Sequence, residues 1–286
     1  MSRPRVAIAT CAAYPELKGD DELLREALRR RGCEAVSVVW DEEEVDWGSF
    51  DLCLVRSTWD YHDKYAAFLD WTQRLEAATR LHNPAELIVW NSDKTYLREM
   101  ADGGVPTVPT LWVKRGARID LEAELGAQGW EEVVVKPVVD LGAKNLHRVG
   151  AGGSQEALSA VLARQGAMIQ PFLPSLEAEG EVSLIYIEGE FSHAVRKLPA
   201  SGDFRVQSIW GGTAAPAKPQ PQQIEVAERA LAQLHEPPLY ARADLVTDLD
   251  GSPALIELEL IEPNLYLSTN RPAAARLADA VIAKLS

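Results

Sequence analysis

The sequence predicts an α/β domain at the N-terminus followed by an α+β fold, and three observations support this prediction. Short apolar strands alternate with amphipathic helices up to about residue 85, which is the pattern of a parallel sheet. The later part of the chain has two hairpin signals, at Glu188–Glu190 and at Asp250-Gly251. The composition, 47% hydrophobic and 25% charged over 286 residues, is that of a globular protein with two or three domains.

The first domain is expected to cover residues 1–90. Its first helix has acidic residues in the first turn, basic residues in the last and Gly32 directly after it, which suits the helix dipole and a C-terminal cap. Ligands of parallel sheets bind at the carboxyl ends of the strands, so we expect a site near 10–21 and 56–61. The predicted strands are Arg5–Thr10, Ala35–Trp40 and Leu52–Arg56, and the predicted helices are Asp20–Arg31 and Tyr65–Thr79.

Two further units are expected, at residues 91–172 and 173–286. The segment Asn91–Asp93 is predicted to cap a helix at Lys94–Ala101, which Gly103-Gly104 ends. The segment Ala214–Gln223 is rich in Pro and Gln, and is predicted to be an exposed loop. Further strands are predicted at Thr110–Lys114, Glu132–Pro137, Ala167–Gln170, Glu181–Ile187, Phe191–Lys197, Tyr240–Thr247 and Pro253–Leu260, and helices at Gln155–Arg164, Ile224–Leu234 and Ala273–Lys284.

Charge, cysteine content and missing motifs argue against several classes of function. A formal net charge of −14 repels a nucleic-acid backbone. The three cysteines form no C-x-x-C pair and are expected to be free thiols in a reducing compartment. The sequence contains no run of about 18 apolar residues, which a membrane span would need, so we expect a cytoplasmic protein. The motifs G-x-G-x-x-G and G-x-x-x-x-G-K-[ST] do not occur, which argues against a nicotinamide-dependent oxidoreductase and a P-loop enzyme.

The hairpin around Asp250-Gly251 carries the most informative pattern. If these two residues form the turn, Asp244 falls opposite Glu257 and Arg242 falls opposite Glu259. Because side chains alternate between faces, these four charged residues share one face of the hairpin. The other face is then apolar, with Ala241, Ala243, Leu245, Ile256, Leu258 and Leu260.

Three carboxylates at this spacing are candidates for a metal site. Cross-strand neighbours lie about 5 Å apart, and carboxylates that close repel one another unless a cation sits among them. Mg²⁺ prefers carboxylate oxygens and substrate phosphates, so Asp244, Glu257 and Glu259 suit a nucleotide-bound Mg²⁺ with one or two ions. The alternative is an ordinary solvated face of an edge hairpin, and the assumed register decides between them.

Several cations upstream suit a polyphosphate. Lys136 interrupts an apolar strand beside Pro137, where it either extends to the surface or points into a cleft. A loop with Gly142 and Lys144 follows at Val138–Asn145. Lys94 is predicted in the first turn of a helix, where a cation is disfavoured unless an anion binds there. Singly, each of these residues and Arg205 reads as a surface residue.

In order along the chain, these motifs resemble the ATP-grasp superfamily. The matching pieces are Lys94, the strand V-V-V-K-P ending at Pro137, I-Q-P-F at Ile169–Phe172, G-E-V-S at Gly180–Ser183, F-R-V-Q with Gly211-Gly212, and A-D-L with E-L-E-L-I-E-P. Within the superfamily the chain is most similar to the branch of ribosomal-protein glutamate ligases and glutathione synthetases, and to the D-cycloserine-forming cyclo-ligases. That closer likeness rests on R-S-T-W-D-Y, N-S-D-K-T-Y-L, G-V-P-T-V-P-T and F-S-H-A-V-R-K.

The resemblance implies an ATP-grasp fold of two subdomains that hold the nucleotide between antiparallel sheets. It assigns Lys94 and Lys136 to the phosphates, Gln170 and Phe172 to the adenine, and Glu181 to the ribose, with Lys144 as a further nucleotide-binding residue. Arg205, Lys136 and Arg242 would stabilise the transferring phosphoryl group, and Asp244, Glu257 and Glu259 would ligate Mg²⁺. Many relatives have Asn where this chain has Glu259, and more glycines in the loop at Val138–Asn145.

The implied activity is ATP-dependent formation of a C–N bond through an acyl phosphate. The loop after the third strand carries Arg56, Ser57, Trp59, Asp60 and Tyr61, which suit a small amino-acid-like substrate or, alternatively, pack between domains; His193 is a further candidate contact. The cyclo-ligase likeness implies that one molecule supplies both carboxylate and nitrogen. An intermolecular amino-acid or peptide ligase and a non-catalytic ATP sensor are the alternatives, and a homodimer is left open.

Overall fold

The structure is a computed structural model that describes residues 3–150 and 155–285. Its first part is a four-stranded sheet with the order β2-β1-β3-β4, in which the paired strands are parallel. The predicted α/β domain is therefore present, and β1 has the predicted bounds. The strands are β1 (Arg5–Thr10), β2 (Glu34–Val39), β3 (Leu52–Ser57) and β4 (Arg80–His82).

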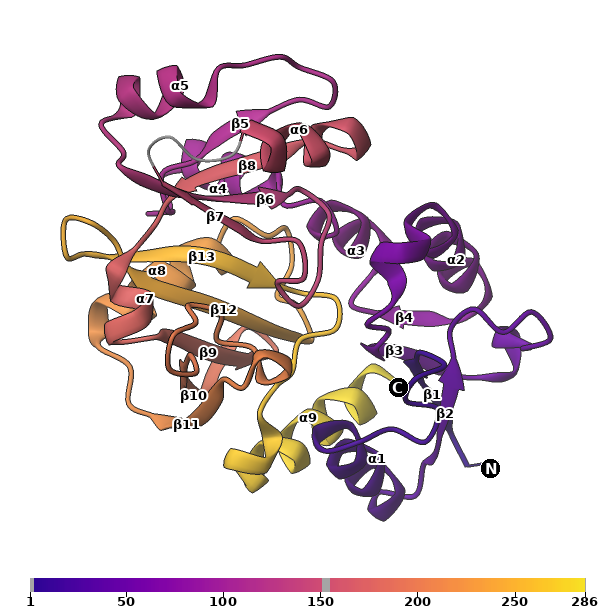
Figure 1. Ribbon diagram of the computed structural model, residues 1–286. Coiled ribbons are helices and arrows are strands. Elements are labelled where there is room, and N and C mark those ends of the chain that lie inside the picture. Colours follow the sequence, from indigo (N-terminus) through magenta and orange to yellow (C-terminus); the bar gives the residue numbers. More distant parts are fainter. Residues whose placement is uncertain (1–2, 151–154, 286) are drawn as a thin grey trace.

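Helices from both ends of the chain cover this first sheet (Figure 1). Helix α1 (Asp20–Arg30) lies beside α9 (Arg271–Lys284), the last helix of the chain. Their buried residues share one apolar core with the sheet, for example Leu24 of α1, Leu277 of α9 and Val6 of β1. The remaining helical segments of this part are η1 (Trp47–Ser49), η2 (Tyr61–Lys64), α2 (Tyr65–Ala78), α3 (Ala85–Asn91) and η4 (Leu267–Thr269).

A second sheet follows, with the order β5-β8-β6-β7 and antiparallel pairing throughout. Apolar side chains of α5 and α6 pack on it, including Leu125 and Leu158, and bury Val133 and Val135 of β6. Figure 1 places this sheet above the third one. Its elements are β5 (Leu111–Val113), α5 (Leu121–Gln128), β6 (Glu132–Pro137), β7 (His147–Gly150), α6 (Gln155–Arg164) and β8 (Ala167–Pro171).

The third sheet is five-stranded and antiparallel, with the order β11-β10-β9-β12-β13. Helices α4 and α8 cover one face through residues such as Met100 and Ala227, and the other face carries the charged residues described below. The elements are α4 (Tyr96–Asp102), α7 (Pro174–Ala178), β9 (Glu181–Ile187), β10 (Glu190–Leu198), η3 (Ser208–Trp210), β11 (Thr213–Ala217), α8 (Pro221–Leu231), β12 (Tyr240–Thr247) and β13 (Pro253–Glu259).

Two predictions about local structure were wrong. Asn91 ends α3 instead of capping the next helix, and α4 begins at Tyr96, so Lys94 precedes it. The Asn91 amide instead bonds the backbone of β13, at Leu258 O and Leu260 N. The segment predicted as a loop at 214–223 contains β11, an edge strand, where a residue such as Pro216 is tolerated.

Cys11, Cys33 and Cys53 are all free and buried. Across the part of the chain that the structure describes, no helix combines the length and the apolar character that a membrane span requires.

Candidate functional site

The hairpin of β12 and β13 brings its charged residues together as predicted. Arg242 pairs with Glu259, and Asp244 pairs with Glu257. The turn, however, is longer by one residue than assumed, because the backbone N–H of Asp248 donates to Ser252 O at 2.8 Å.

A bulge in β13 offsets that longer turn. Leu245 pairs with Leu255 while Asp244 pairs with Glu257, so Ile256 is an extra residue in the strand. Ile256 therefore packs beside Ala254 and not with the apolar face of Leu258, which corrects its predicted position. The predicted register of the carboxylates is correct because the longer turn and the bulge at Ile256 offset each other.

Asp244, Glu257 and Glu259 form one cluster, in which an oxygen from each lies within 4.8 Å of the others. Protein cations contact all three carboxylates. Lys94 Nζ lies 3.0 Å from Glu257, and Arg242 bonds Asp244 at 2.8 Å and also Glu259. The repulsion among the three carboxylates is therefore already offset by Lys94 and Arg242, and does not by itself require a divalent ion. This corrects the prediction that was based on the spacing of the carboxylates. Three hard oxygen donors in this geometry nonetheless suit Mg²⁺.

Lys197 of β10 joins this cluster and was not predicted. Its side chain is buried, its Nζ lies 3.2 Å from Asp244 Oδ2, and it also pairs with Glu181 of β9. Strict alternation from the turn at 188–189 would place Arg196 opposite Glu181. A bulge between Phe191 and His193 shifts the pairing, so that Lys197 faces Glu181. The sequence signal was only a lysine inside an apolar strand.

The predicted adenine contacts lie where β8 leaves the second sheet. The Gln170 amide donates to Thr110 Oγ1 at 2.9 Å, while its buried Oε1 has no partner among the described residues. The Phe172 ring has the Arg148 guanidinium 3.5 Å from its centroid and the Phe204 ring in an edge contact at 5.7 Å. Gln170 thus keeps a free acceptor, whereas Phe172 is already packed.

The pKa values of the site residues follow from burial and from neighbouring charges. Burial raises the pKa of Glu181 to about 8 and that of Glu259 to about 7. Burial acts to raise the pKa of Asp244 as well, but Arg242 and Lys197 hold it well below its usual range. The pKa of Lys94 is raised because Glu257 outweighs the effect of its burial.

Lys136 is the cation that the fold stabilises least. Burial lowers the pKa of its ammonium from 10.5 to about 8, and nearby Lys94 acts in the same direction. Between these two pKa values the unfolded chain holds a proton that the folded chain has released. The stability of the folded chain should therefore rise as the pH increases from about 8 towards 10.5.

We expect Lys136→Met to raise the melting temperature of the protein alone, because it removes a buried charge that costs roughly 2–3 kcal/mol near neutral pH. The gain should shrink from about pH 7.5 to about pH 9.5, as the parent lysine loses its proton. Thermal unfolding at both pH values tests this, and calorimetry should show weaker ATP binding by the variant. A variant that melts at or below the parent temperature at pH 7.5 would contradict the argument.

Three of the predicted substrate residues are engaged within the protein. Buried Arg56 donates to Asp21 at 2.9 Å and to Pro263 O at 2.7 Å, and Ser57 Oγ donates to the same aspartate. Asp60 accepts from Trp40 Nε1 and pairs with a lysine on the surface. Arg56 therefore joins the first sheet to the segment after β13.

Trp59 and Tyr61 also have partners within the protein, and the buried Tyr61 ring stacks on Phe68 at 4.5 Å. Trp59 Nε1 donates to the backbone oxygen of Glu262 at 3.1 Å. Burial raises the pKa of Tyr61, and the negative charges of Glu262 and Glu257 raise it further. The Tyr61 hydroxyl therefore interacts electrostatically with the cluster. Burial, and then Glu259, raises the pKa of Glu262 to about 8. Glu262 belonged to the matching motif, but the sequence suggested no role for it.

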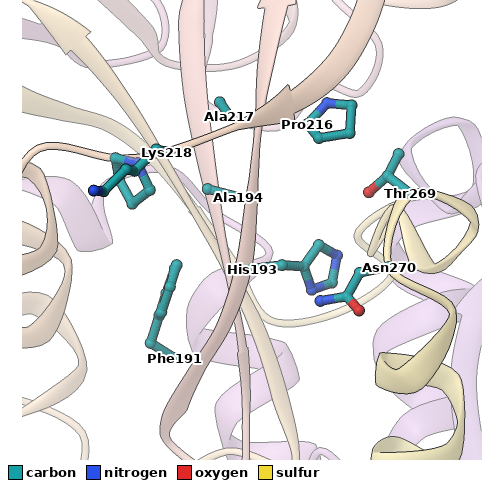
Figure 2. Close-up of a pocket in the computed structure, with 9 residues that line it drawn as sticks. Phe191, His193, Ala194, Pro216, Ala217, Lys218, Thr269 and Asn270 are labelled. Carbon is teal, nitrogen blue, oxygen red and sulfur yellow. The ribbon is translucent and has the colours of Figure 1, made fainter.

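His193 lies apart from the cluster. Its Nε2 bonds Leu265 O at 3.0 Å and its Nδ1 bonds Ser192 Oγ at 3.0 Å. Figure 2 shows the imidazole pointing towards Asn270 in a surface hollow of about 300 Å³. None of the clustered carboxylates lines this hollow, so a substrate contact by His193 has no support from its position.

Arg205 and Lys144 lie outside the carboxylate cluster. Arg205 pairs with Asp203, and Lys144 is exposed on the β6–β7 loop, residues Val138–Asn145. This loop is fixed near the cluster by Lys94, whose backbone N–H donates to Val138 O and whose Nζ donates to Asp140 O, both at 2.8 Å.

Comparison with known families gives two matches. Residues 6–83 match the N-terminal domain of D-cycloserine synthetase DcsG, and residues 116–260 match the ATP-grasp domain of prokaryotic glutathione synthetase.

Individual proteins agree with these matches. The cycloserine biosynthesis protein DcsG of Streptomyces lavendulae is 32% identical over 98% of both chains. A glutathione synthetase of Prochlorococcus marinus (strain MIT 9313) is 31% identical over 76% of this chain and 70% of its own. The crystal structure of D-cycloserine synthetase DcsG superposes with a TM-score of 0.89, at 32% identity, over 99% of this chain and 100% of that one. A D-alanine–D-alanine ligase from Bacillus anthracis shares the fold, with a TM-score of 0.70 at 14% identity over 99% of this chain and 97% of its own.

Proposed function

This chain belongs to the ATP-grasp ligases and, within them, to the family of D-cycloserine synthetase DcsG, and from this premise we propose that it closes a ring within one small amino-acid-like substrate. It is an ATP-dependent carboxylate–amine ligase. The observation that carries the ring-closing proposal is the match over 98% of both chains, because it includes the N-terminal domain that borders the cluster. The product we expect is D-cycloserine or a similar ring.

The clustered residues suit the nucleotide and one or two Mg²⁺ ions. Asp244, Glu257 and Glu259 would hold the metal, and Lys94 and Lys136 would contact the phosphates. Bound Mg²⁺ would neutralise charge on the phosphate oxygens. Gln170 offers a free amide oxygen to a base amine, and Glu181 offers a carboxylate to the ribose.

The reaction has two steps. A carboxylate oxygen of the substrate attacks the γ-phosphorus of ATP, ADP leaves, and an acyl phosphate forms. The substrate nitrogen then attacks the acyl carbon, phosphate leaves, and the nitrogen gives up a proton. With an O-ureido substrate the ring nitrogen still carries a carbamoyl group, which water must remove as carbon dioxide and ammonia before the product is D-cycloserine. Arg242 would stabilise the negative charge, and its guanidinium is already fixed at the cluster by Asp244, which supports this role. Trp59 and Tyr61 would orient the substrate from the side of the first domain.

An intermolecular ligase is the second candidate, since the glutathione synthetases share the ATP-grasp part of the chain. Incubation with ATP, Mg²⁺ and O-ureido-D-serine separates the two, with O-ureido-L-serine as the matched control. Ring closure predicts a cyclic product by mass spectrometry, together with ADP, for the D-isomer. ADP formation that requires a second amine, with an open amide as the product, would overturn the ring-closing proposal.

A further inference from the structure

A short segment between β10 and β11, Asp203–Gly212, forms a loop that we name the arginine loop. The Asp203 carboxylate accepts from the backbone N–H groups of Phe204 and Arg205 at 2.8 and 2.9 Å. The Gln207 carbonyl accepts from the N–H groups of Trp210 and Gly212. A Cβ atom at Gly212 would lie 2.1 Å from the Val206 oxygen, so only glycine fits there. The loop is therefore held in one shape by its own contacts.

Arg205 is held from two sides within the arginine loop. Its guanidinium bonds both oxygens of the Asp203 carboxylate. The same guanidinium lies 3.6 Å from the centroid of the Trp210 ring, which is a cation–π contact. The indole face of Trp210 thus sets the plane in which the guanidinium lies.

The indole edge of Trp210 contacts a different part of the chain. Its Nε1–H donates to the carbonyl of Gly142 in the β6–β7 loop at 2.9 Å. On its other side, the β6–β7 loop packs Leu141 against the apolar core of the first domain. Between these two contacts, Lys94 Nζ donates to the backbone oxygen of Asp140 and so holds the middle of the β6–β7 loop. The β6–β7 loop therefore rests on the first domain, on Lys94 and on Trp210.

We propose that Trp210 is a positioning residue that couples closure of the β6–β7 loop to the orientation of Arg205. One indole makes both contacts. When Trp210 moves, Gly142 of the β6–β7 loop loses its hydrogen bond, and the Arg205 guanidinium loses the ring against which it lies. The proposal rests on the proposed function, because an acyl phosphate hydrolyses when water reaches it and a closed loop excludes water.

Two substitutions separate the two contacts. Trp210→Phe keeps an aromatic face for Arg205 and removes the N–H donor, while Trp210→Ala removes both. In Trp210→Phe we expect the ratio of ADP to ligated product to rise roughly 2- to 10-fold, the effect of losing one hydrogen bond from the closed state. Trp210→Ala should in addition slow the formation of ADP, because Arg205, which the ATP-grasp resemblance assigns to the transferring phosphoryl group, is no longer oriented.

The matched control is Trp90→Phe, which also removes one indole hydrogen bond, to the exposed side chain of Glu99, and touches neither Gly142 nor Arg205. Amide hydrogen exchange in the β6–β7 loop, measured with ATP and Mg²⁺, should be faster in Trp210→Phe than in Trp90→Phe. Equal exchange rates and equal product ratios in these two variants would overturn the proposal. Exchange needs no turnover, so a parent protein that makes no ring refutes the proposed function without affecting this comparison.

Discussion

Replacement of Glu257 by glutamine is expected to lower kcat/KM for ATP with Mg²⁺ on the order of 100-fold or more and to leave the fold intact. Glu257 is partly exposed, and Lys94 is its ion-pair partner, at 3.0 Å. An amide keeps the shape of the side chain and one oxygen, but it removes a full negative charge from the cluster. The substitution should weaken metal and nucleotide binding and leave the stability of the fold unchanged, because the Glu257 side chain does not pack in an apolar core.

The matched control for this variant is Asp250→Asn, the same carboxylate-to-amide change at the exposed tip of the same hairpin. Steady-state kinetics over a range of Mg²⁺ concentrations should show a higher Mg²⁺ requirement for Glu257→Gln and an unchanged requirement for Asp250→Asn. If both variants keep the parent kcat/KM and the parent Mg²⁺ dependence, Glu257 does not ligate the metal.

The second large effect is expected at Lys197. Lys197→Met should destabilise the folded protein by about 3–5 kcal/mol, because it leaves buried carboxylates without their cation. Asp244 keeps Arg242 as a partner, so the uncompensated charge falls mainly on Glu181. Methionine has nearly the same length as lysine and leaves no cavity, so the change measures charge and not packing.

Urea unfolding near pH 9, above the pKa of about 8 that Glu181 has in the folded chain, measures this loss of stability, with Lys284→Met as the control. Lys284 is exposed and lies 3.8 Å from Glu188, so its removal should cost less than about 1 kcal/mol. The double variant Lys197→Met, Glu181→Gln should recover part of the stability, since it removes the stranded charge as well. A single variant as stable as Lys284→Met would show that the buried pair adds no net stability.

The sequence was sufficient for the elements that are bounded by strong signals. The strand at Arg5–Thr10 and the helix at Gln155–Arg164 have the predicted bounds. Short elements such as β4 and β7 were missed, because three or four residues give too little periodicity. The helix boundary near Asn91 was wrong because a capping residue also suits tertiary hydrogen bonds, and here it bonds β13.

For the site, the limit was the register of the strands. Residues on one strand can be assigned to a face from period two, but a bulge shifts that assignment, and nothing in the sequence marks the bulges at Ile256 or near Phe191. One bulge left the carboxylate pairs in place, and the other, with the shorter turn at 188–189, sets Lys197 opposite Glu181. Arg56 and Ser57 end a strand at the expected edge of the sheet, but both side chains donate hydrogen bonds to Asp21 and are not free to bind a substrate. Such pairings between distant segments follow from the folded chain alone.

The position of α9 has a consequence for how this protein is made. Leu277 and Val281 complete the core around Val6, and Arg31 pairs with Asp279. A ribosome synthesises Val6 long before Leu277, so the first segment has an uncovered apolar surface until α9 has been made. A premature stop before residue 271 would leave that part of the core uncovered.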